Sequence, residues 1–560
     1  MAGMNRRIKL AGWLTAAFCI PLALARPAAA ADHDTLTIGV STYPPTLTPL
    51  IDPTAAKSYV LGFVLRPLTA YDADWQPICM LCSGPLPTLE NGKAVREDRP
   101  DGKHGIAITY TLQPKATWGD GTPVTTRDVR FTWELAREPK TGATNLEQFK
   151  RITAIDVTDD KTFTLHVDRV DFQYNVIDLE LLPAHLEQAA AEDPAQYHTR
   201  TLYETQPSNP GLYFGPYRIT EAVSGSHIVL ERNPTWYGKQ PVFRRIVIRA
   251  IENSAALESN LLSGGVDYLP GELGLSLDQG LAFEKRRDAR FAVSYKPSLI
   301  YSHVDLNLDN PILQDVRVRH ALLMALDRDT LNRTLFGGKQ PPADSFINAL
   351  DWVYDPDGLK YPYDPQGAAR LLDEAGWSMM RNGVRHNAAG QPLSLELMGA
   401  SGNRSGELVE QVLQSDWRKS GIDVKIRNLA ARVLFDNIQH RRFPGMSIFA
   451  WGSAPENVPR TILRSDQIPS EANHWTGQND TGFKDPETDR LLDAIEIELD
   501  RDKRAALWHR LQRRYAELLP VLPLYFRSTP FIRPTWLGGI VPTGHMFPST
   551  LWVEDWTVAP

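Results

Sequence analysis

The sequence predicts an α/β fold arranged as two lobes. Short alternating apolar runs predict strands, and helical segments separate them, a rhythm typical of sheets with crossover helices. The character of the chain changes near Ser294 to Pro297, and strand and helix signals begin again after it. With 560 residues, the chain also exceeds the size of a single hydrophobic core. Two lobes, each with its own sheet, best explain this layout.

The first half of the chain mixes short strands with helices and one hairpin. The hairpin spans residues 211–236 and turns at Ser224-Gly225-Ser226. Further along the chain, Gly264-Gly265 ends the predicted helix Ala255–Ser263. The predicted strands are Leu36–Val40, Ala107–Gln113, Ile246–Ile251 and Val266–Leu269, and the predicted helices are Ala55–Leu65, Leu182–Ala191 and Ala255–Ser263.

The segment from Trp118 to Trp133 predicts a strand end, a tight turn and a helix start. Asp120-Gly121-Thr122-Pro123 supplies turn residues. Thr125 and Asp128 have the spacing of a capping box, with Asp in place of the usual Glu. We therefore expect a helix that begins directly after Thr125.

The second half repeats the same alternation with longer helices. The helix that ends before Gly421 is amphipathic, and the last strand is apolar and marked by prolines. The predicted strands are Tyr301–Leu308, Ile422–Ile426, Ile448–Trp451 and Leu518–Phe526, and the predicted helical segments are Val316–Leu326, Ser405–Lys419 and Asp485–Tyr515.

The N-terminus has the pattern of a cleaved signal peptide. Arg6, Arg7 and Lys9 are followed by the largely apolar run Leu10 to Leu24 and then by Ala28-Ala29-Ala30. Pro21 and Arg26 leave the apolar run too short to span a bilayer. We expect residues 1–30 to be removed near Ala30/Ala31, with export to the periplasm as a soluble protein.

The charge balance argues against nucleic acid as a partner. Removal of residues 1–30 takes away four positive charges and no negative one, which changes the formal net charge from −7 to −11. A strongly acidic protein has no overall attraction to nucleic acid or to anionic lipid.

Cys79 and Cys82 are the cysteines that remain after such processing. Their C-M-L-C spacing suggests a redox or metal site in a reducing compartment, but an exported protein favours a disulfide. A single pair cannot supply the four ligands of a structural zinc site. We interpret the pair as a disulfide that staples a loop, and we expect no metal site and no cofactor.

Five separated segments carry a family resemblance. The first is the run from Trp118 to Trp133. In the same order along the chain, the five resemble signatures of the solute-binding proteins that serve peptide-type ABC importers, the oligopeptide- and dipeptide-binding family (family 5, type II or cluster C). The other four are Gly215–Tyr217 with Leu230–Tyr237 (GPY … LERNPTWY), Asn307–Pro311 with Asp315–Arg328, Lys484–Leu492 (KDPETDRLL), and Leu519–Tyr525 (LPVLPLY).

The resemblance implies a two-lobe fold of the periplasmic binding protein-like II type, with an extra inserted subdomain in lobe one. Ligand would lie in the cleft between the lobes, and the lobes would close on it by a hinge motion. The expected division is residues 31–70, 206–295 and 521–560 for the main domain of lobe one, 71–205 for the inserted subdomain, and 296–520 for lobe two.

The function implied is solute capture for an ABC importer, not catalysis. The expected cargo is a peptide or peptide-like solute, and the expected partners are membrane permease subunits with a cytoplasmic ATPase. The binding protein itself would be a monomer. Relatives of this fold also carry oligosaccharides, nickel complexes or haem, so the fold alone does not select the cargo.

The loop after the strand at 448–451 is the richest candidate for ligand contact, since ligands meet the carboxyl ends of strands in open α/β sheets. Trp451 can stack on cargo, although packing in the core explains it equally well. Peptide-binding relatives often carry an Asp two or three positions after this Trp, but Ser453 and Ala454 stand there. Glu456 is the nearby substitute, so recognition of a free peptide N-terminus is in question.

Four further residues complete the predicted binding set. Tyr43 follows the first strand and offers stacking plus a hydroxyl, and Arg404 can pair with a ligand carboxylate. Asn473 and Trp475 lie in a loop rich in groups that bind peptide backbone. Packing for Tyr43 and Trp475, and solvent exposure for Arg404, are the plainer explanations of the same residues.

An enzyme is the alternative from a different class. The sequence contains no G-x-S-x-G, no H-E-x-x-H and no phosphate-binding glycine loop. Catalytic triads are recognised by geometry and not by sequence position, so a periplasmic hydrolase, or a thiol oxidoreductase that uses Cys79 and Cys82, is the competing hypothesis.

Overall fold

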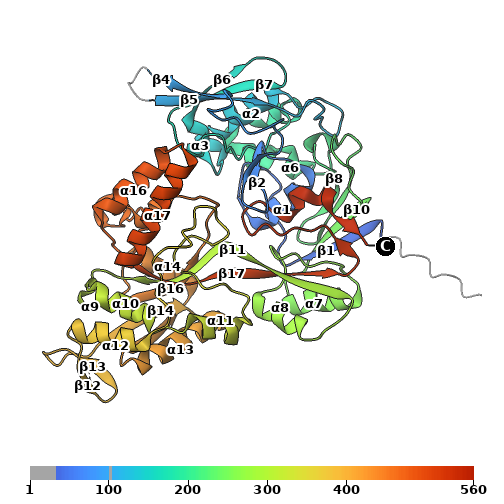
Figure 1. Ribbon diagram of the computed structural model, residues 1–560. Coiled ribbons are helices and arrows are strands. Elements are labelled where there is room, and N and C mark those ends of the chain that lie inside the picture. Colours follow the sequence, from blue (N-terminus) through green and yellow to red (C-terminus); the bar gives the residue numbers. More distant parts are fainter. Residues whose placement is uncertain (1–32, 100–103, 560) are drawn as a thin grey trace, which may run out of the picture.

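The computed structural model describes residues 33–99 and 104–559, and it forms two lobes with an inserted subdomain above them (Figure 1). The predicted signal peptide at residues 1–30 lies outside the described residues. Across the described part of the chain, no helix is long and apolar enough to cross a membrane.

Lobe one is built around a four-stranded sheet with the order β1-β10-β9-β8. β1 pairs with β10 in parallel, and the hairpin β8–β9 continues the sheet in antiparallel fashion. Helix α7 ends at Gly264, which has the left-handed backbone conformation that glycine tolerates best. The elements are β1 (Thr35–Val40), α1 (Ala55–Val64), β8 (Tyr217–Val223), β9 (His227–Arg232), β10 (Arg245–Ala250), α7 (Ser254–Ser263) and α8 (Leu277–Glu284).

The inserted subdomain carries its own antiparallel sheet, with the order β4-β5-β7-β6, and a group of short helices. Its strands are β2 (Thr69–Tyr71), β3 (Pro77–Cys79), β4 (Ala94–Asp98), β5 (His104–Thr111), β6 (Ile152–Val157) and β7 (Thr162–Val167). Its helices are α2 (Thr126–Ala136), η1 (Pro139–Thr141), α3 (Leu146–Arg151), α4 (Ala184–Ala191), η2 (Pro194–Gln196), α5 (Tyr197–Arg200), α6 (Leu202–Thr205) and η3 (Pro210–Leu212).

The segment around Trp118 forms the turn and capped helix that its sequence predicts. Thr125 caps α2, and the Asp128 carboxylate accepts a hydrogen bond from the Thr125 backbone N–H at 2.8 Å. Asp128 also accepts bonds from Trp118 Nε1 and the Ala184 N–H, so the cap connects α2 to the turn and to α4. Trp118 is fully buried in the core of lobe one, where its role is structural.

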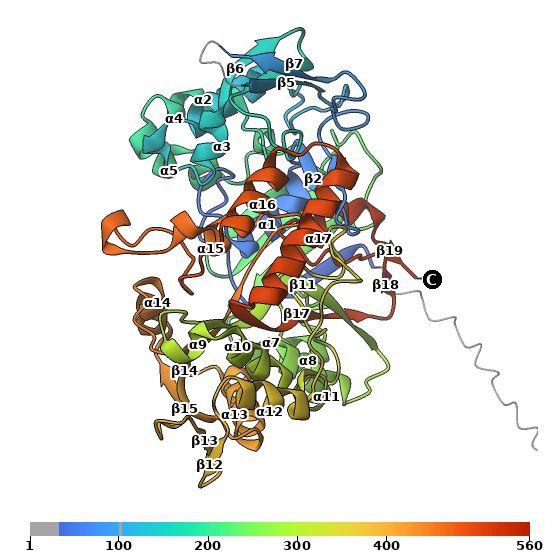
Figure 2. The ribbon, with the colours of Figure 1, turned by 60° about the vertical axis from the view of Figure 1, so that its left-hand side comes forward.

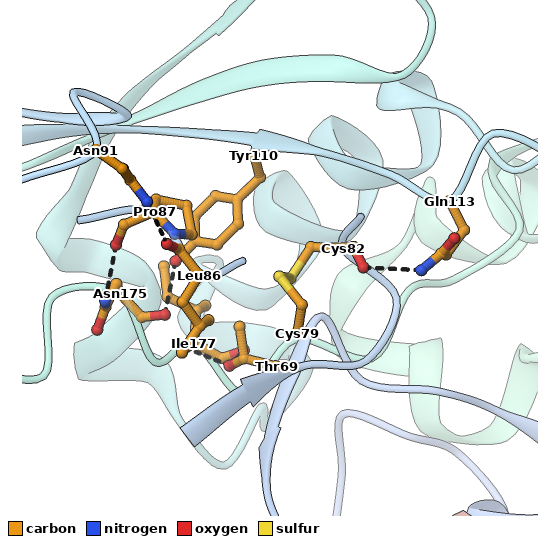
Figure 3. Close-up of a disulfide and its surroundings, with 10 residues drawn as sticks. All are labelled: Thr69, Cys79, Cys82, Leu86, Pro87, Asn91, Tyr110, Gln113, Asn175 and Ile177. Atoms are coloured by element: carbon orange, nitrogen blue, oxygen red, sulfur yellow. Dashed lines mark hydrogen bonds between the residues drawn. A yellow bond between two sulfur atoms is a disulfide. The ribbon is translucent and has the colours of Figure 1, made fainter. Parts of the chain in front are cut away.

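A disulfide joins Cys79 at the end of β3 to Cys82 (Figure 3). The Gln113 side chain donates a hydrogen bond to the Cys82 carbonyl at 3.0 Å. The bridge therefore closes the short loop from Cys79 to Cys82 directly after β3, as a loop staple does.

Lobe two is built around a five-stranded sheet with the order β15-β14-β16-β11-β17. Its strands, with one small hairpin, are β11 (Phe291–Leu306), β12 (Met379–Arg381), β13 (Val384–His386), β14 (Ser394–Ala400), β15 (Asp423–Leu429), β16 (Met446–Trp451) and β17 (Val521–Pro534). Its helices are α9 (Pro311–Gln314), α10 (Val316–Met324), α11 (Arg328–Phe336), α12 (Pro365–Glu374), α13 (Arg404–Lys419), α14 (Ala431–Gln439), α15 (Arg460–Leu463), η4 (Ser465–Gln467), η5 (Glu471–Asn473), α16 (Pro486–Ile497) and α17 (Arg501–Leu518). The chain ends with β18 (Leu537–Gly538), η6 (Ser549–Asp555) and β19 (Thr557–Val558).

Strands β11 and β17 form a long antiparallel ribbon that runs through both lobes (Figure 1). Their outer parts lie beside α7 and α8, and their inner parts belong to the five-stranded sheet. Residue 521, where the expected division returns the chain to lobe one, is the first residue of β17. The first half of this strand pairs in the sheet of lobe two, and its second half pairs with the outer part of β11.

Three sequence predictions of secondary structure differ from the structure. The strand predicted from Tyr301 begins ten residues earlier, at Phe291, because its outer half pairs with the distant strand β17. The helical stretch 485–515 is two helices, since the chain turns between Ile497 and Arg501. The predicted strand 266–269 is only two isolated bridges, Ile38 to Tyr268 and Leu269 to Ile532.

Asp485 links helices α16 and α17, which together form a helical hairpin. Its carboxylate caps α16 by accepting bonds from the Thr488 N–H and hydroxyl at 2.9 and 2.8 Å. The same carboxylate accepts two bonds from Arg514 on α17, at 2.9 and 2.8 Å. These bonds, above all those from Arg514, lower the pKa of Asp485 to about 2.

Replacement of Asp485 by Ala is expected to lower the free energy of unfolding by about 2 kcal/mol near neutral pH, because a helix cap and two charge-assisted bonds are lost. A carboxyl whose folded pKa is depressed contributes stability above its unfolded pKa and loses it as the pH falls. The difference from wild type in urea denaturation should therefore shrink toward about pH 2. Asp502→Ala, at an exposed position of α17, is the control and should change stability by less than about 0.5 kcal/mol. A gap that persists unchanged at low pH would contradict this role.

Candidate functional site

Four neighbouring cavities are lined by residues of lobe one, the inserted subdomain and lobe two, and we call them together the interlobe cleft. Their volumes are about 210, 310, 720 and 240 Å³. The first and second share Asp178 and Phe547, the second and third share Tyr71 and Tyr174, and the second and fourth share Ala454. The shared wall residues show that these cavities are neighbours.

The α16–α17 hairpin reaches from lobe two to the inserted subdomain (Figure 2). Residues at the turn between the two helices line the third cavity of the cleft. The Phe172 N–H donates a hydrogen bond to the Glu496 carbonyl at 2.9 Å. Phe172 is packed into the hydrophobic cluster of α16 and α17, and the Arg504 guanidinium lies 4.7 Å from its ring centroid. The two lobes are thus already in contact at this edge.

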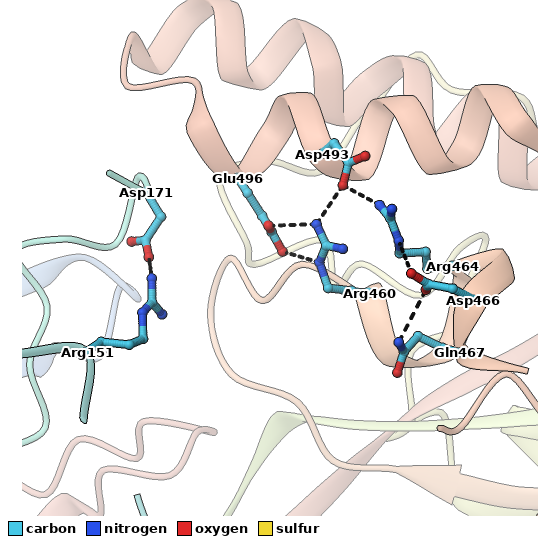
Figure 4. A network of polar contacts seen from close by, with 8 residues as sticks. All are labelled: Arg151, Asp171, Arg460, Arg464, Asp466, Gln467, Asp493 and Glu496. Atoms are coloured by element: carbon cyan, nitrogen blue, oxygen red, sulfur yellow. Dashed lines mark hydrogen bonds and ion pairs between the residues drawn. The ribbon is translucent and has the colours of Figure 1, made fainter. Parts of the chain in front are cut away.

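Ion pairs surround this contact on both sides (Figure 4). In lobe two, Arg460 pairs with Asp493 at 2.7 Å and with Glu496 at 2.6 Å. In the inserted subdomain, Arg151 pairs with Asp171, the residue before Phe172. These ion pairs each lie within one lobe, and the contact across the edge includes the backbone bond of Phe172, its ring beneath Arg504, and a bond from Arg501 to Gln76.

The largest cavity is lined by aromatic rings and by charged groups of α17. Tyr71, Phe172 and Tyr174 come from the inserted subdomain, and Trp352 comes from lobe two. The Arg501 guanidinium lies 4.1 Å above the Trp352 ring and donates a bond to Gln76 across the cleft at 3.0 Å. Rings plus rigid donors suit a solute with both flat apolar and polar parts.

The fourth cavity is formed entirely by lobe two at the carboxyl end of β16. Trp451, Gly452, Ser453 and Ala454 line one side. Trp451 is half-buried and contacts the edge of the Phe449 ring, with 5.6 Å between centroids. Its indole is therefore held by the core on one side and faces the cavity on the other.

Glu456 lines the largest cavity, but its carboxylate is already bonded. Arg504 pairs with it, and the Trp352 indole N–H donates to it at 3.1 Å. Burial raises the pKa of Glu456, and the Arg504 charge opposes that rise. The carboxylate acts in the structure as the partner of a buried arginine.

The other four predicted binding residues lie away from the four cavities. Tyr43 packs against the core of lobe one, where burial and the charge of Glu204 raise its pKa. Arg404 is exposed as the first residue of α13. Asn473 bonds Ser470 and Ile468 of its own loop, and Trp475 lies against His440 with 5.0 Å between ring centroids. The structure thus places Trp451 and Ser453 on the fourth cavity and Glu456 on the third. The other four predicted residues line none of the four cavities.

Sequence reasoning missed most of the wall that the inserted subdomain provides. Tyr71, Phe172 and Tyr174 carry no motif: Tyr71 ends the short strand β2, Phe172 and Tyr174 lie in an irregular segment, and the fold brings all three to the third cavity. The alternation of Phe172 and Tyr174 was the one available signal.

Ionisable side chains line the first cavity of the cleft. Lys57 is buried and donates to the carbonyls of Thr48 and Pro49 at 3.1 and 3.0 Å. Asp178 and Glu180 line the same cavity. Burial, reinforced by the Asp178 charge, raises the pKa of Glu180 to about 8. Among the described residues, no group of His, Cys, Asp and Glu has the arrangement of a metal site.

Comparisons with known proteins place these features in a family context. A model of the bacterial extracellular solute-binding proteins, family 5 (middle region), matches residues 97–467. The oligopeptide-binding protein OppA of Bacillus subtilis is 23% identical over 532 residues, covering 91% of this chain and 90% of its own. A putative ABC transporter peptide-binding protein of Brucella ovis is 28% identical over 273 residues, and the match spans about half of each protein, 48% of this chain and 49% of the relative.

Solved structures show the same fold. The oligopeptide-binding protein of Thermus thermophilus, determined with a pentapeptide, is 28% identical with a TM-score of 0.67, covering 94% of this chain and 96% of its own. NikZ of Campylobacter jejuni, determined with Ni(L-His), is 21% identical with a TM-score of 0.70, covering 94% of this chain and 99% of its own.

The pair Arg504–Glu456 gives a test of the wall of the largest cavity. Arg504→Met leaves the Glu456 carboxylate buried without its partner and is expected to lower the free energy of unfolding by about 3 kcal/mol or more. The double variant Arg504→Met/Glu456→Gln removes the buried charge and should recover part of that loss. Urea denaturation of both variants measures the effect. A double variant no more stable than Arg504→Met would show that the two side chains do not support each other.

Proposed function

Because the chain belongs to the bacterial extracellular solute-binding proteins of family 5, we propose that it captures a peptide or peptide-like solute in the interlobe cleft for an ABC importer. The cleft carries this proposal, since its four neighbouring cavities are together lined from both lobes and from the inserted subdomain. A ligand held there would contact both lobes, which is how binding favours closure.

The proposal includes the site and the partners of the protein. It would act in the periplasm after removal of its signal peptide, as a monomer that delivers the solute to membrane permease subunits driven by a cytoplasmic ATPase. Capture and release need no catalytic group, so we propose a binding protein and not an enzyme. Of the residues predicted from sequence, Trp451 and Ser453 are the ones best placed to contact the solute, because both line the cavity at the end of β16.

The chemistry of the cleft favours peptides over other cargo. Its walls offer aromatic rings, indole and guanidinium donors, and acidic groups, a mixture that suits amide backbone and varied side chains. The likeness to a nickel-complex binder at 21% identity shows a shared fold and gives no argument for a metal cargo.

Native mass spectrometry of protein purified without refolding tests the proposed function. We expect a co-purified mass that fragments as a peptide or a peptide derivative. A saccharide or a metal chelate in its place would contradict the assignment of the cargo class.

Trp451 provides a test within the cleft. Trp451→Ala removes the ring that faces the fourth cavity, and loss of such a stacked ring is expected to weaken binding of the co-purified solute about tenfold or more. Trp536→Ala removes a ring that stacks on His33 in lobe one and is the matched control. Calorimetric titration of the stripped proteins measures both. Equal affinities for Trp451→Ala and the control would exclude Trp451 from the binding site.

A further inference from the structure

The first cavity of the cleft lies between lobe one and the inserted subdomain, beside the second cavity. Its volume is about 210 Å³, and a cavity of about 150 Å³ already holds a benzene ring. It shares Asp178, Met546 and Phe547 with the second cavity, which Ala454 of lobe two also lines. A solute in the second cavity can therefore extend one long side chain into the first.

Two acidic side chains line the first cavity without a partner. In the segment that carries them, Ile177, Leu179 and Leu181 are buried in the core. Asp178 and Glu180 alternate with these residues and line the cavity. Within the described part of the chain, neither carboxyl group accepts a hydrogen bond or forms an ion pair. Carboxyl groups that are largely removed from water are costly without donors, so both favour a donor from outside the chain.

Lys57 also lines the cavity, but its ammonium group is bonded elsewhere. The side chain is only 3% exposed, and it donates to the backbone carbonyls of Thr48, Pro49 and Ile51. These bonds use all three donors of the ammonium group. Its charge balances one carboxylate through space, so ionisation of both acidic groups leaves an uncompensated negative charge beside the cavity.

Much of the remaining wall is apolar. Phe149 of the inserted subdomain and Phe547 and Leu551 of the C-terminal segment line the cavity, and all three are buried. A basic side chain of lysine or arginine type has an apolar stem and a charged end. The cavity matches both parts, because apolar side chains line it together with the two acidic groups.

Resting on the proposed function, we propose that the first cavity holds a basic side chain of the solute, with Asp178 and Glu180 as the partners of its ammonium or guanidinium group. The solute class is then a peptide or peptide-like molecule with a side chain of lysine or arginine type. Its backbone would lie in the second cavity, between the inserted subdomain and Ala454. Charge-assisted hydrogen bonds to the carboxylates would select for the basic group.

Three tripeptide libraries that differ at one position test the pocket. The variable position is lysine, arginine or norleucine, which keeps an apolar stem without the charge, and no other basic residue is present. Native mass spectrometry of the stripped protein measures the peptide concentration for half occupancy. We expect wild type to bind at least one basic library about tenfold more tightly than the norleucine library. The preferred basic library identifies the head group that the pocket accepts.

Variants assign the preference to the two acidic groups. Asp178→Asn/Glu180→Gln should lose the preference and bind the norleucine library as wild type does. Asp52→Asn is the matched control and should keep the preference, because Asp52 is exposed and acts on the same Lys57 charge without lining the cavity. A preference that persists in the double variant would overturn the assignment to these carboxyl groups.

The library comparison also separates this proposal from the proposed function. Equal binding of all three libraries by wild type would overturn the basic pocket and leave peptide binding intact. Binding of none of them would overturn the peptide function and the pocket with it. The wild-type comparison needs no variant, so it decides the proposal even where a variant does not fold.

Proton release on binding gives a readout that a purely structural role would not change. Burial and the Asp178 charge raise the pKa of Glu180 to about 8, with Lys57 opposing them. Tyr203 of α6 is a further titratable group close to Glu180. At pH 7 the Glu180 carboxyl group of the empty protein is therefore mostly protonated, and a bound cation favours its ionised form.

Calorimetric titrations in two buffers of different ionisation enthalpy measure this release. At pH 7 the peptide of the preferred basic type should release about one proton more than its norleucine counterpart, and its advantage in affinity should grow as the pH rises from about 6 to 8. Glu180→Gln should abolish both effects. Equal proton release by the two peptides on wild type would contradict the role of Glu180.

Discussion

The long ribbon of β11 and β17 is the constraint on which the rest of the structure depends. Its outer part pairs Phe291–Pro297 with Ser528–Pro534, and its inner part pairs Tyr301–Asp305 with Val521–Phe526. Between Pro297 and Tyr301 the register shifts, so that three residues of β11 face one of β17. Such a bulge bends and twists a strand locally. Both lobes are attached to this ribbon on either side of the irregular region, and we infer that their relative motion is concentrated there.

The same ribbon also positions the chemistry of the cleft. Its inner half carries Tyr301, His303 and Asp305 and pairs with β16, whose end presents Trp451. On the opposite side, one phenylalanine from the inserted subdomain fills a cluster of α16 and α17. The ion pairs at this edge lie within one lobe or the other, and the contacts of charged groups that cross it are those of Arg501 with Gln76 and of Arg504 with the Phe172 ring. Weak contact between the lobes is what a binding protein needs if the solute is to supply the energy of closure.

Local signals predicted much of the fold, whereas tertiary contacts determined what the sequence could not show. The capping box of Thr125 and Asp128 and the helix stop at Gly264 depend on neighbouring residues, and both were predicted. The outer half of β11 was missed because Pro297 and the change in composition resemble a boundary, while its pairing partner lies more than 200 residues away. Glu456 looked free in sequence, but Arg504, 48 positions away, pairs with it. The place of Trp451 beside a cavity could be predicted because ligands meet the ends of strands, whereas the wall that Tyr71 and Tyr174 provide depends on the fold alone.

A crystal structure of the protein with its co-purified solute tests the central claim most directly. The account predicts solute density within the interlobe cleft, in contact with Trp451 of lobe two and with Tyr71 or Tyr174 of the inserted subdomain. Density confined to one lobe, or bound on the outer surface away from these residues, would contradict it.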